Sequence, residues 1–485
     1  MNQTGNEARG VLLSTFFQIL GKFVNAFLSL LTVRILTNTL SKGEYGDYIT
    51  LFEFMGFFGI AADFGLFTIA VREMSAHPRI KKKIFGNILS IRLILIAFFC
   101  VLAGILGGIV FREKTYMQLG IWIISLTTTM TLLAGTFTAV LQTHLQMGKA
   151  AIAAIFSKLI SFSLIYYFSL QFDGIKTFYD YLWAGTWGAL GMLILVIIFV
   201  SRISSFSLRF DFDFWKETIK KSLPYGLALI LTQIYFKIDI QMIYFLRGDT
   251  EAGIYGISVR IIEALSLFAI FFMNSVMPIL SPALRRNKEK AKKIVQYSFN
   301  FLFLISAPML FGAPAVSRDL ISLIGNEDYL SHPGFWGSDW ILNFLIIAMC
   351  FSYLGIVFEF LLIALGKQKK LLLINFIGVS VNLILNFIFI PSYGILAAAI
   401  TSIVCEMLVM ALKLLFSMKD MEDFSLETSS AQKILFSALA MGFAVFFLRE
   451  KAGFIASIFL SALLYFFLIF MTRAIDKEFL RRLRS

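Results

Sequence analysis

The sequence predicts an all-α integral membrane protein with about 14 transmembrane helices. Hydrophobic residues make up 59% of the 485-residue chain and aromatic residues 16%, and the mean hydropathy is +0.82. A soluble core of this length does not need so many apolar side chains. They are grouped in repeated runs of about 20 residues, the length that a helix needs to cross the hydrocarbon core of a bilayer.

The spans follow one another along the chain with short polar connections. Pro308 and Pro314 lie inside the ninth run and predict that its helix is kinked or broken. The last two runs follow an acidic and polar linker at residues 419–430. The predicted spans are residues 11–36, 47–71, 85–110, 117–144, 150–171, 178–201, 223–246, 253–279, 295–324, 340–365, 370–391, 394–417, 431–448 and 453–472.

Two short motifs recur six spans apart and predict an internal repeat. The pattern ExGxY occurs at residues 44–48 and 251–255, and the pair Gly-Lys occurs at residues 148–149 and 366–367. Because six is an even number, the two halves keep the same orientation, so they form a parallel pseudo-twofold repeat about an axis along the membrane normal. We expect the substrate path to run between two six-helix lobes. The predicted segments are an N-lobe at 1–205, a C-lobe at 206–420, and a C-terminal helix pair with a basic tail at 421–485.

Basic residues are distributed unevenly between the two sets of loops. About 29 Lys and Arg residues fall in one set and about 8 in the other, which is the positive-inside pattern. The richer set includes Arg72–Lys83, Arg202–Lys221, Arg285–Lys293 and the tail Arg473–Arg484. We therefore expect both termini to be cytoplasmic, and we interpret the net charge of +13 as a topology signal, not as a nucleic-acid-binding surface. A specific headgroup site in one cluster is the alternative.

Residues suited to catalysis or metal binding are few. The chain has three His and three Cys. His77 and His332 fall in predicted loops, the cysteines fall inside apolar runs, and no spacing matches a metal site. No GxxxxGK[ST] phosphate-binding loop occurs in the sequence. We therefore expect neither an enzyme nor a protein with a metal or another cofactor.

Polar side chains inside the spans are the candidates for function. An ionisable group at the centre of a membrane helix costs about 2.5–3.5 kcal/mol, and several cations facing lipid would cost on the order of 15 kcal/mol, more than the net stability of a typical fold. These cations must face water, a counter-charge or an anionic ligand, so we expect a wet, cationic central cavity. Polar residues also recur at helical spacing in the first and seventh spans. The candidate substrate-binding residues are Lys22, Asn25, Arg92, Lys158, Gln233, Lys237 and Arg260.

Each of these cations has a structural alternative. Arg92 and Lys158 lie within about two turns of the cytoplasmic ends of their spans, so their side chains can snorkel towards the headgroups. Lys22 and Lys237 lie too deep for easy snorkelling. For them the alternative is an ion pair inside the helix bundle.

Three acidic residues are candidates for ion coupling. Asp63, Asp239 and Glu263 lie in predicted spans, and we expect them to bind H⁺ or Na⁺ during transport. The alternative is that they only neutralise Lys237 and Arg260, for instance through a pair between Lys237 and Asp63 or Glu263. Arg260 and Glu263 are three residues apart, so we expect them to share a helix face.

The clearest family pattern lies in residues 222–282. It contains Pro224-Tyr-Gly, Lys237-x-Asp239, the second ExGxY motif and a helix closed by proline, while the N-terminal half has Asp63-Phe-Gly65-Leu and Ala70-Val-Arg72-Glu73. With these residues the chain resembles the polysaccharide (O-antigen, repeat-unit) flippases of the multidrug/oligosaccharidyl-lipid/polysaccharide exporter (MOP) superfamily, over about the first 420 residues. The departure is the count of about 14 spans, since 12 is commonest among polysaccharide flippases. This count leaves the lipid II flippase branch open.

The resemblance implies a flippase that works by alternating access. It would move undecaprenyl-pyrophosphate-linked oligosaccharides from the cytoplasmic to the outer leaflet of the bacterial cytoplasmic (inner) membrane. Lys and Arg suit pyrophosphate, and Asn and Gln suit sugar hydroxyls. The expected partners are this lipid-linked oligosaccharide, membrane lipids, H⁺ or Na⁺, and a polysaccharide polymerase or synthesis complex. The open alternatives are a cation-coupled multidrug antiporter of the same superfamily, a lipid II flippase, and a membrane-embedded enzyme or structural partner of a synthesis complex.

Overall fold

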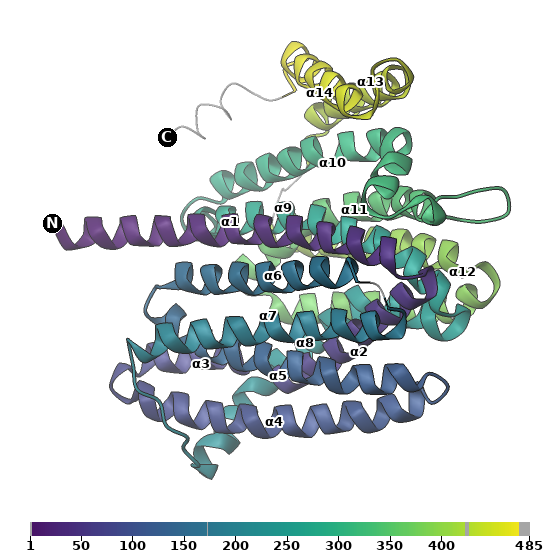
Figure 1. Ribbon diagram of the computed structural model, residues 1–485. Coiled ribbons are helices and arrows are strands. Elements are labelled where there is room, and N and C mark those ends of the chain that lie inside the picture. The colour runs from purple at the N-terminus through teal and green to yellow at the C-terminus, as the bar shows by residue number, and fades with distance from the viewer. Residues whose placement is uncertain (1, 172, 422–425, 475–485) are drawn as a thin grey trace. The chain divides into compact units, whose positions relative to one another are not determined.

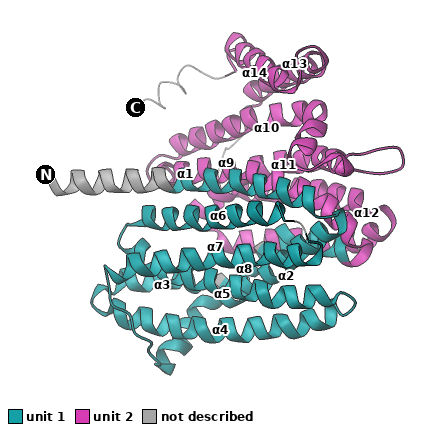
Figure 2. Ribbon diagram, in the orientation of Figure 1, with its two compact units in different colours: residues 1–244 teal, residues 245–485 magenta. Residues whose placement is uncertain are grey.

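The computed structural model describes residues 2–171, 173–421 and 426–474, and within helices it leaves out the side chains of residues 2–17, 224, 225, 228, 232 and 420. Over these ranges the chain forms fourteen α-helices and two short 3₁₀-helices and no β-strand (Figure 1). The helices group into two compact units, residues 1–244 and 245–485 (Figure 2). The division that the sequence predicts, at residues 205 and 420, stays a prediction. The predicted tail Arg473–Arg484 lies outside the described residues from residue 475 on, as does the linker at residues 422–425.

The first unit has its apolar core among helices α3 to α7. Met74, Phe85, Val140 and Val200 are all buried in this core. Helix α1 packs against α6, α6 and α5 pack against α7, and α2, α3 and α4 pack against α5. The elements are α1 (Asn2–Thr39), α2 (Lys42–Asp63), α3 (Leu66–Ala76), η1 (Pro78–Ile80), α4 (Lys81–Val110), α5 (Thr115–Thr143), α6 (Met147–Ser169), α7 (Ile175–Ser201) and α8 (Phe212–Arg247), which extends into the second unit.

The second unit is built around α9, α10 and α11. The two C-terminal helices pack on α10, where Tyr465 donates a hydrogen bond to the Leu304 carbonyl at 2.8 Å. At Gly442 a Cβ would lie 2.6 Å from the Phe311 carbonyl oxygen, so the missing side chain lets α13 approach α10 closely. The elements are α9 (Asp249–Arg286), α10 (Lys288–Ile324), η2 (Glu327–Tyr329), α11 (Ser338–Ala364), α12 (Gln368–Asp420), α13 (Ser429–Ala452) and α14 (Phe454–Met471).

The predicted fold class is confirmed. Thirteen helical segments among the described residues are long and apolar enough to cross a membrane. One of them, α12, covers both the eleventh and the twelfth predicted spans. Many large apolar side chains lie on the outside of the helices, Ile455 and Phe470 among them. Such a surface is suited to lipid and not to water.

Helix breaks occur at glycines, not at the prolines that the sequence singled out. Helix α10 continues through Pro308 and Pro314, so the predicted break is wrong there, while the predicted kink stays a prediction. Within α12, Gly394 has φ of 60° and ψ of −143°, which is not helical. Phe64 and Gly65, both left-handed, separate α2 from α3 inside the predicted second span. Only glycine adopts a positive φ without steric cost, which accounts for its place at these breaks.

The two halves share one break that the motifs did not reveal. Gly174 (φ 52°, ψ −129°) precedes α7, and Gly394 has nearly the same conformation before the second half of α12. Both glycines precede an isoleucine, and they begin the sixth and the twelfth spans. The Gly-Lys pairs, by contrast, are not equivalent. Gly366 has φ of 73° in a turn between helices, whereas Gly148 lies inside α6.

Candidate functional site

A line of polar contacts joins α2 to α8 within the first unit. The contributing residues are spaced by three positions on α2 and by four and three on α8, so each set lies on one helix face. We call these six residues the polar seam. Its contacts are Lys237 Nζ to Glu53 Oε1 at 3.1 Å, Gln241 Nε2 to the Thr50 carbonyl at 2.9 Å, and Tyr244 OH to Asp47 Oδ1 at 2.7 Å.

The Lys237–Glu53 ion pair is largely withdrawn from solvent. The side chain of Glu53 is 5% exposed and that of Lys237 is 18% exposed. The sequence suggested Asp63 or Glu263 as the partner of Lys237, and the structure gives it Glu53. Glu53 therefore compensates the charge that made Lys237 a candidate, and the ion-pair alternative accounts for this lysine.

The seam continues one helical turn further at Gln233. A Cβ on Gly56 would lie 3.2 Å from the Gln233 amide nitrogen. The absence of a side chain at Gly56 thus makes room for an amide between two membrane helices. Gln233 was predicted as a sugar-binding residue, and the structure places its amide beside the backbone of α2.

Asp47 is the most enclosed acid of the seam. Its side chain is 1% exposed. Lys114 Nζ donates to both of its carboxylate oxygens at 2.7 and 2.8 Å, and Tyr116 OH and Tyr244 OH also donate to it. Three donors satisfy a carboxylate that would otherwise be costly to bury. The sequence alone did not reveal this cluster, although Asp47 is one of the two variable residues inside the first ExGxY motif.

The Asp63-Phe-Gly-Leu motif forms the break between α2 and α3. The turn lets the Gly65 N–H donate to Asp63 Oδ2 at 3.2 Å, while Arg92 Nη1 donates to Asp63 Oδ1 at 2.6 Å. Phe64 packs on Gly226 of α8, where a Cβ would come within 2.9 Å of the ring. The motif thus positions one carboxylate against one guanidinium.

This arrangement corrects the snorkelling interpretation of Arg92. Its side chain is 1% exposed and points to Asp63, not to the headgroup level. The sequence separates these two residues into different candidate roles, one for substrate and one for coupling ions. The structure brings them together as one pair. The Arg92 Nε is also enclosed without a hydrogen-bond acceptor among the described residues.

Lys22 and Asn25 lie one turn apart on α1. Lys22 is exposed, and the neighbouring Gly21 packs against Ala151 and Ile155 of α6. Asn25 Oδ1 is buried and accepts no hydrogen bond from the described part of the chain. Lys158 on α6 is half-buried. An exposed cation in a membrane helix, beside an enclosed amide oxygen, fits a polar ligand better than lipid. Ser14 lies at helical spacing from Lys22 and Asn25 in the first predicted span, but its side chain lies outside the described residues.

In the second unit, Arg260 and Glu263 form an ion pair at 2.8 Å. The sequence predicted that they share a helix face of α9, but placed them in different roles. Asp239, the remaining coupling candidate, is half-buried on α8.

Two ion pairs between helices of the second unit were not predicted. Lys413 of α12 binds Glu359 of α11 at 2.6 Å, and Arg449 of α13 binds Asp319 of α10 at 2.7 Å. All four residues lie at or near the ends of predicted spans, where a charge is not in itself conspicuous. No signal in the sequence alone could have paired them.

Glu251 of the second ExGxY motif caps the break in α12. Its carboxylate accepts from Ile395 N at 3.1 Å and from Arg247 Nε at 2.8 Å. The equivalent Glu44 instead forms a capping box with Ser41 at the start of α2. In both units, the glutamate of the motif therefore accepts a hydrogen bond from a backbone N–H at a helix N-terminus, but from a different partner.

An all-helical protein with ion pairs and amides buried inside its membrane spans is organised as a membrane transporter. The chain belongs to the polysaccharide biosynthesis protein family of the MOP superfamily, since residues 11–284 match the family "Polysaccharide biosynthesis protein" and residues 224–388 match the family "MatE". A putative O-antigen transporter of Shigella flexneri is 23% identical over 413 residues, which cover 81% of this chain and 94% of the relative. An uncharacterized membrane protein of Methanocaldococcus jannaschii is 26% identical over 196 residues, 39% of this chain and 38% of the relative.

Solved structures agree with this assignment at the level of fold. The lipid II flippase MurJ in an inward closed conformation aligns over 95% of this chain and 99% of its own, with a TM-score of 0.75 and 16% identity. An inward-facing multidrug resistance MATE family transporter of the MOP superfamily aligns over 83% and 94%, with a TM-score of 0.64 and 14% identity. The family resemblance seen in the sequence motifs is confirmed, and the protein is a multi-pass MOP superfamily transporter.

Proposed function

We propose that this protein flips undecaprenyl-pyrophosphate-linked oligosaccharide repeat units from the cytoplasmic to the outer leaflet, by alternating access through a cationic cavity. The family match and the putative O-antigen transporter among its relatives support this substrate class. The structural observation that carries the proposal is the pair Lys22 and Asn25 on α1. It combines an exposed lysine with a buried amide oxygen that accepts no hydrogen bond from the described residues.

The chemistry of this pair suits a sugar pyrophosphate. A lysine ammonium donates to phosphate oxygens as a point charge, and an amide oxygen accepts from a sugar hydroxyl. A cationic drug would be repelled by Lys22, so this pair argues against the multidrug antiporter. We assign Lys22, Asn25 and Lys158 to substrate contact. The other four candidates would contribute to transport through the ion pairs and amide contacts described above. They are Arg92, Gln233, Lys237 and Arg260.

The proposal is tested in proteoliposomes that contain the purified full chain and a fluorescent lipid-linked oligosaccharide. A quencher added outside the vesicles measures the fraction of the fluorescent lipid that has crossed the bilayer. We expect Lys22→Gln to lower the flipping rate by about tenfold or more, because it removes a charge-assisted hydrogen bond worth about 1.5–3 kcal/mol. Lys22→Arg should restore most of the rate because charge is the required property. Normal flipping by a well-folded Lys22→Gln variant would refute the binding role.

The same assay separates the related functions. Lipid II has a different glycan on the same kind of pyrophosphate lipid. A cationic dye represents the substrates of the drug antiporters. We expect transport of the oligosaccharide lipid in preference to both. Preference for lipid II would keep the flippase class and change the cargo, whereas dye transport without lipid flipping would overturn the proposal.

Ion coupling and cellular context follow from the same proposal. Asp63, Asp239 and Glu263 would bind H⁺ or Na⁺, and Asp63 and Glu263 would exchange their arginine partners for this ion. The protein would reside in the bacterial cytoplasmic membrane with both termini cytoplasmic. It would work beside a polysaccharide polymerase or synthesis complex, as its cargo requires.

A further inference from the structure

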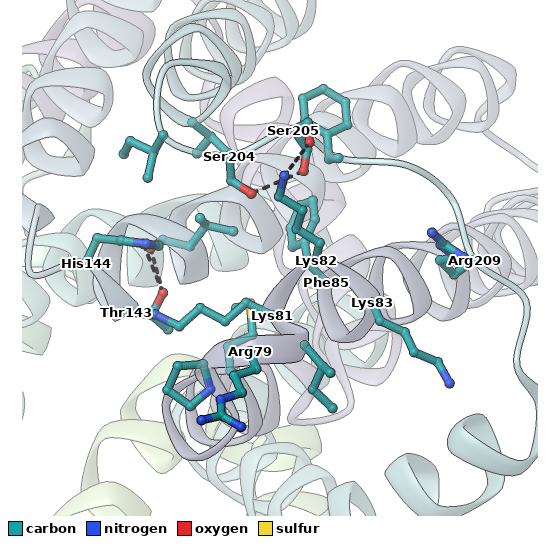
Figure 3. A pocket seen from close by; sticks show the side chains of 17 residues that line it. Arg79, Lys81, Lys82, Lys83, Phe85, Thr143, His144, Ser204, Ser205 and Arg209 are labelled. Carbon is teal, nitrogen blue, oxygen red and sulfur yellow. Dashed lines mark hydrogen bonds between the residues drawn. The ribbon is translucent and has the colours of Figure 1, made fainter.

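A cavity of about 450 Å³ opens at one end of the first unit (Figure 3). Its walls come from η1 and the start of α4, the ends of α5 and α7, and the linker at residues 202–211. No carboxylate lies among its described lining residues. The titratable side chains that line it are Arg79, Lys81, Lys82, Lys83, His144 and Arg209.

The linker that closes one side of the cavity is anchored to α4. Arg209 N donates to the Gly86 carbonyl at 3.4 Å, and Asp211 N donates to Oδ1 of the buried Asn87 at 2.9 Å. A Cβ on Gly86 would lie 2.2 Å from the Ser207 carbonyl oxygen, so only glycine permits this approach. The wall is therefore a built part of the fold.

Most of the positive charge in the cavity is not neutralised by acids. Lys83 binds Asp211 at 2.8 Å, and this hydrogen bond holds the pKa of the Asp211 carboxyl below its usual value. Lys82 Nζ donates at 2.9 Å to the neutral hydroxyl of Ser205 (Figure 3). Within the described residues, no ion pair to a carboxylate forms at Arg79, Lys81 or Arg209.

Much of the remaining lining is apolar, beside the hydroxyls of Thr143, Ser204 and Ser205. Its apolar side chains include Met74, Phe85, Val140, Val200 and Phe206. Phe85, Phe137 and Phe206 stack edge to face, with ring centroids 5.1 to 6.4 Å apart. A ligand that fills this space thus meets both cations and aromatic carbon.

We propose that this pocket binds the phosphate group of an anionic membrane lipid, at a site separate from the cargo-binding residues. Five cations from η1, the first turn of α4 and the linker line one cavity, and four of them lack an acidic partner among the described residues. Basic groups at the ends of membrane helices attract anionic headgroups. The apolar wall favours an amphiphile over free phosphate, since only an amphiphile gains from contact with it. The site depends neither on the flipped cargo nor on the direction of transport.

The experiment measures lipid binding by the purified full chain in neutral detergent. Short-chain phosphatidylglycerol, short-chain phosphatidylcholine and inorganic pyrophosphate are titrated separately, with native mass spectrometry as the readout. The test variant is Arg79→Gln/Lys81→Gln/Arg209→Gln. The matched control is Arg285→Gln/Arg286→Gln/Lys290→Gln, which removes the same charge from an exposed basic segment of the second unit.

We expect the pocket variant to bind phosphatidylglycerol at least about tenfold more weakly, since it loses several charge-assisted contacts. The affinity of the control for phosphatidylglycerol should change by less than about twofold, because exposed charges are screened by salt. Phosphatidylcholine binding should be equal in all three proteins, because its headgroup has no net charge. Gly86→Ala keeps every charge but displaces the linker, so it should also weaken phosphatidylglycerol binding. If the triple variant fails to fold, Arg79→Gln alone, at an exposed position, serves in its place.

Two other results would overturn the proposed lipid site. Equal losses in the pocket and control variants would show that net charge alone attracts the lipid, and would overturn the site. Pyrophosphate binding that the pocket variant loses, without a preference for phosphatidylglycerol over phosphatidylcholine, would support a phosphate site and overturn the lipid as its source.

Discussion

The Lys237–Glu53 pair offers the sharpest test of how the membrane interior of the first unit is held together. Lys237→Gln leaves Glu53 charged in a position where only 5% of its side chain is exposed. Breaking a buried ion pair by removing one partner costs about 3–5 kcal/mol. Because Lys237 is 18% exposed, we expect a loss near the lower end, about 3 kcal/mol.

Removing both charges should be far less costly than removing one. The double variant Glu53→Gln/Lys237→Gln retains two amides that can hydrogen-bond to each other and leaves no buried charge. Replacing both members of a buried pair is often close to neutral. We therefore expect a strongly non-additive cycle, with a coupling energy of about 1–3 kcal/mol.

The assay is thermal unfolding of the purified proteins, followed by intrinsic fluorescence, together with the yield of monodisperse protein. The control is Lys292→Gln. Lys292 pairs with Glu289 at 2.8 Å, but Glu289 is 75% exposed, and such a surface pair contributes about 0–1 kcal/mol. The control should unfold at nearly the temperature of the unmodified protein. An additive cycle, in which the double variant loses as much as the two single variants together, would refute the reasoning.

The same double variant separates structure from substrate binding. If Lys237 only balances Glu53, the double variant should fold and flip normally. If Lys237 also contacts the pyrophosphate, the double variant should fold but flip slowly. The second outcome would restore Lys237 to the substrate-binding set that the sequence predicts.

Three further predictions follow from the structure and the topology. Asp63→Asn/Glu263→Gln should weaken the dependence of flipping on the ion gradient in proteoliposomes, and full retention of that dependence would remove both residues from the coupling role. A single cysteine in place of Lys288 should resist membrane-impermeant reagents in intact cells, whereas its labelling would invert the proposed orientation. Gly394→Ala should destabilise the second unit by at least about 1–3 kcal/mol, because φ is positive there and a Cβ would lie 2.5 Å from Glu251 Oε2; an unchanged unfolding temperature would contradict this account of the break.

The fold class and the family could be predicted from the sequence because each depends on local properties. The length and apolar content of a span are set directly by the thickness of a bilayer. The first ExGxY motif and Asp63-Phe-Gly65 lie at a helix cap and a helix break, which involve residues close together in the chain. For the same reason, the shared face of Arg260 and Glu263 was predicted correctly from their spacing.

The partners of the charged residues could be decided only by the tertiary structure. Lys237 lies 184 positions from Glu53, and Arg92 lies 29 positions from Asp63, so helix periodicity does not relate them. The cavity beside Arg79 likewise depends on a linker more than 100 positions away, held against α4 by Gly86. The sequence shows that a charge inside the membrane must be compensated, since its desolvation cost is a property of the residue alone. Which group compensates it depends on how the helices pack, and packing is a property of the whole fold.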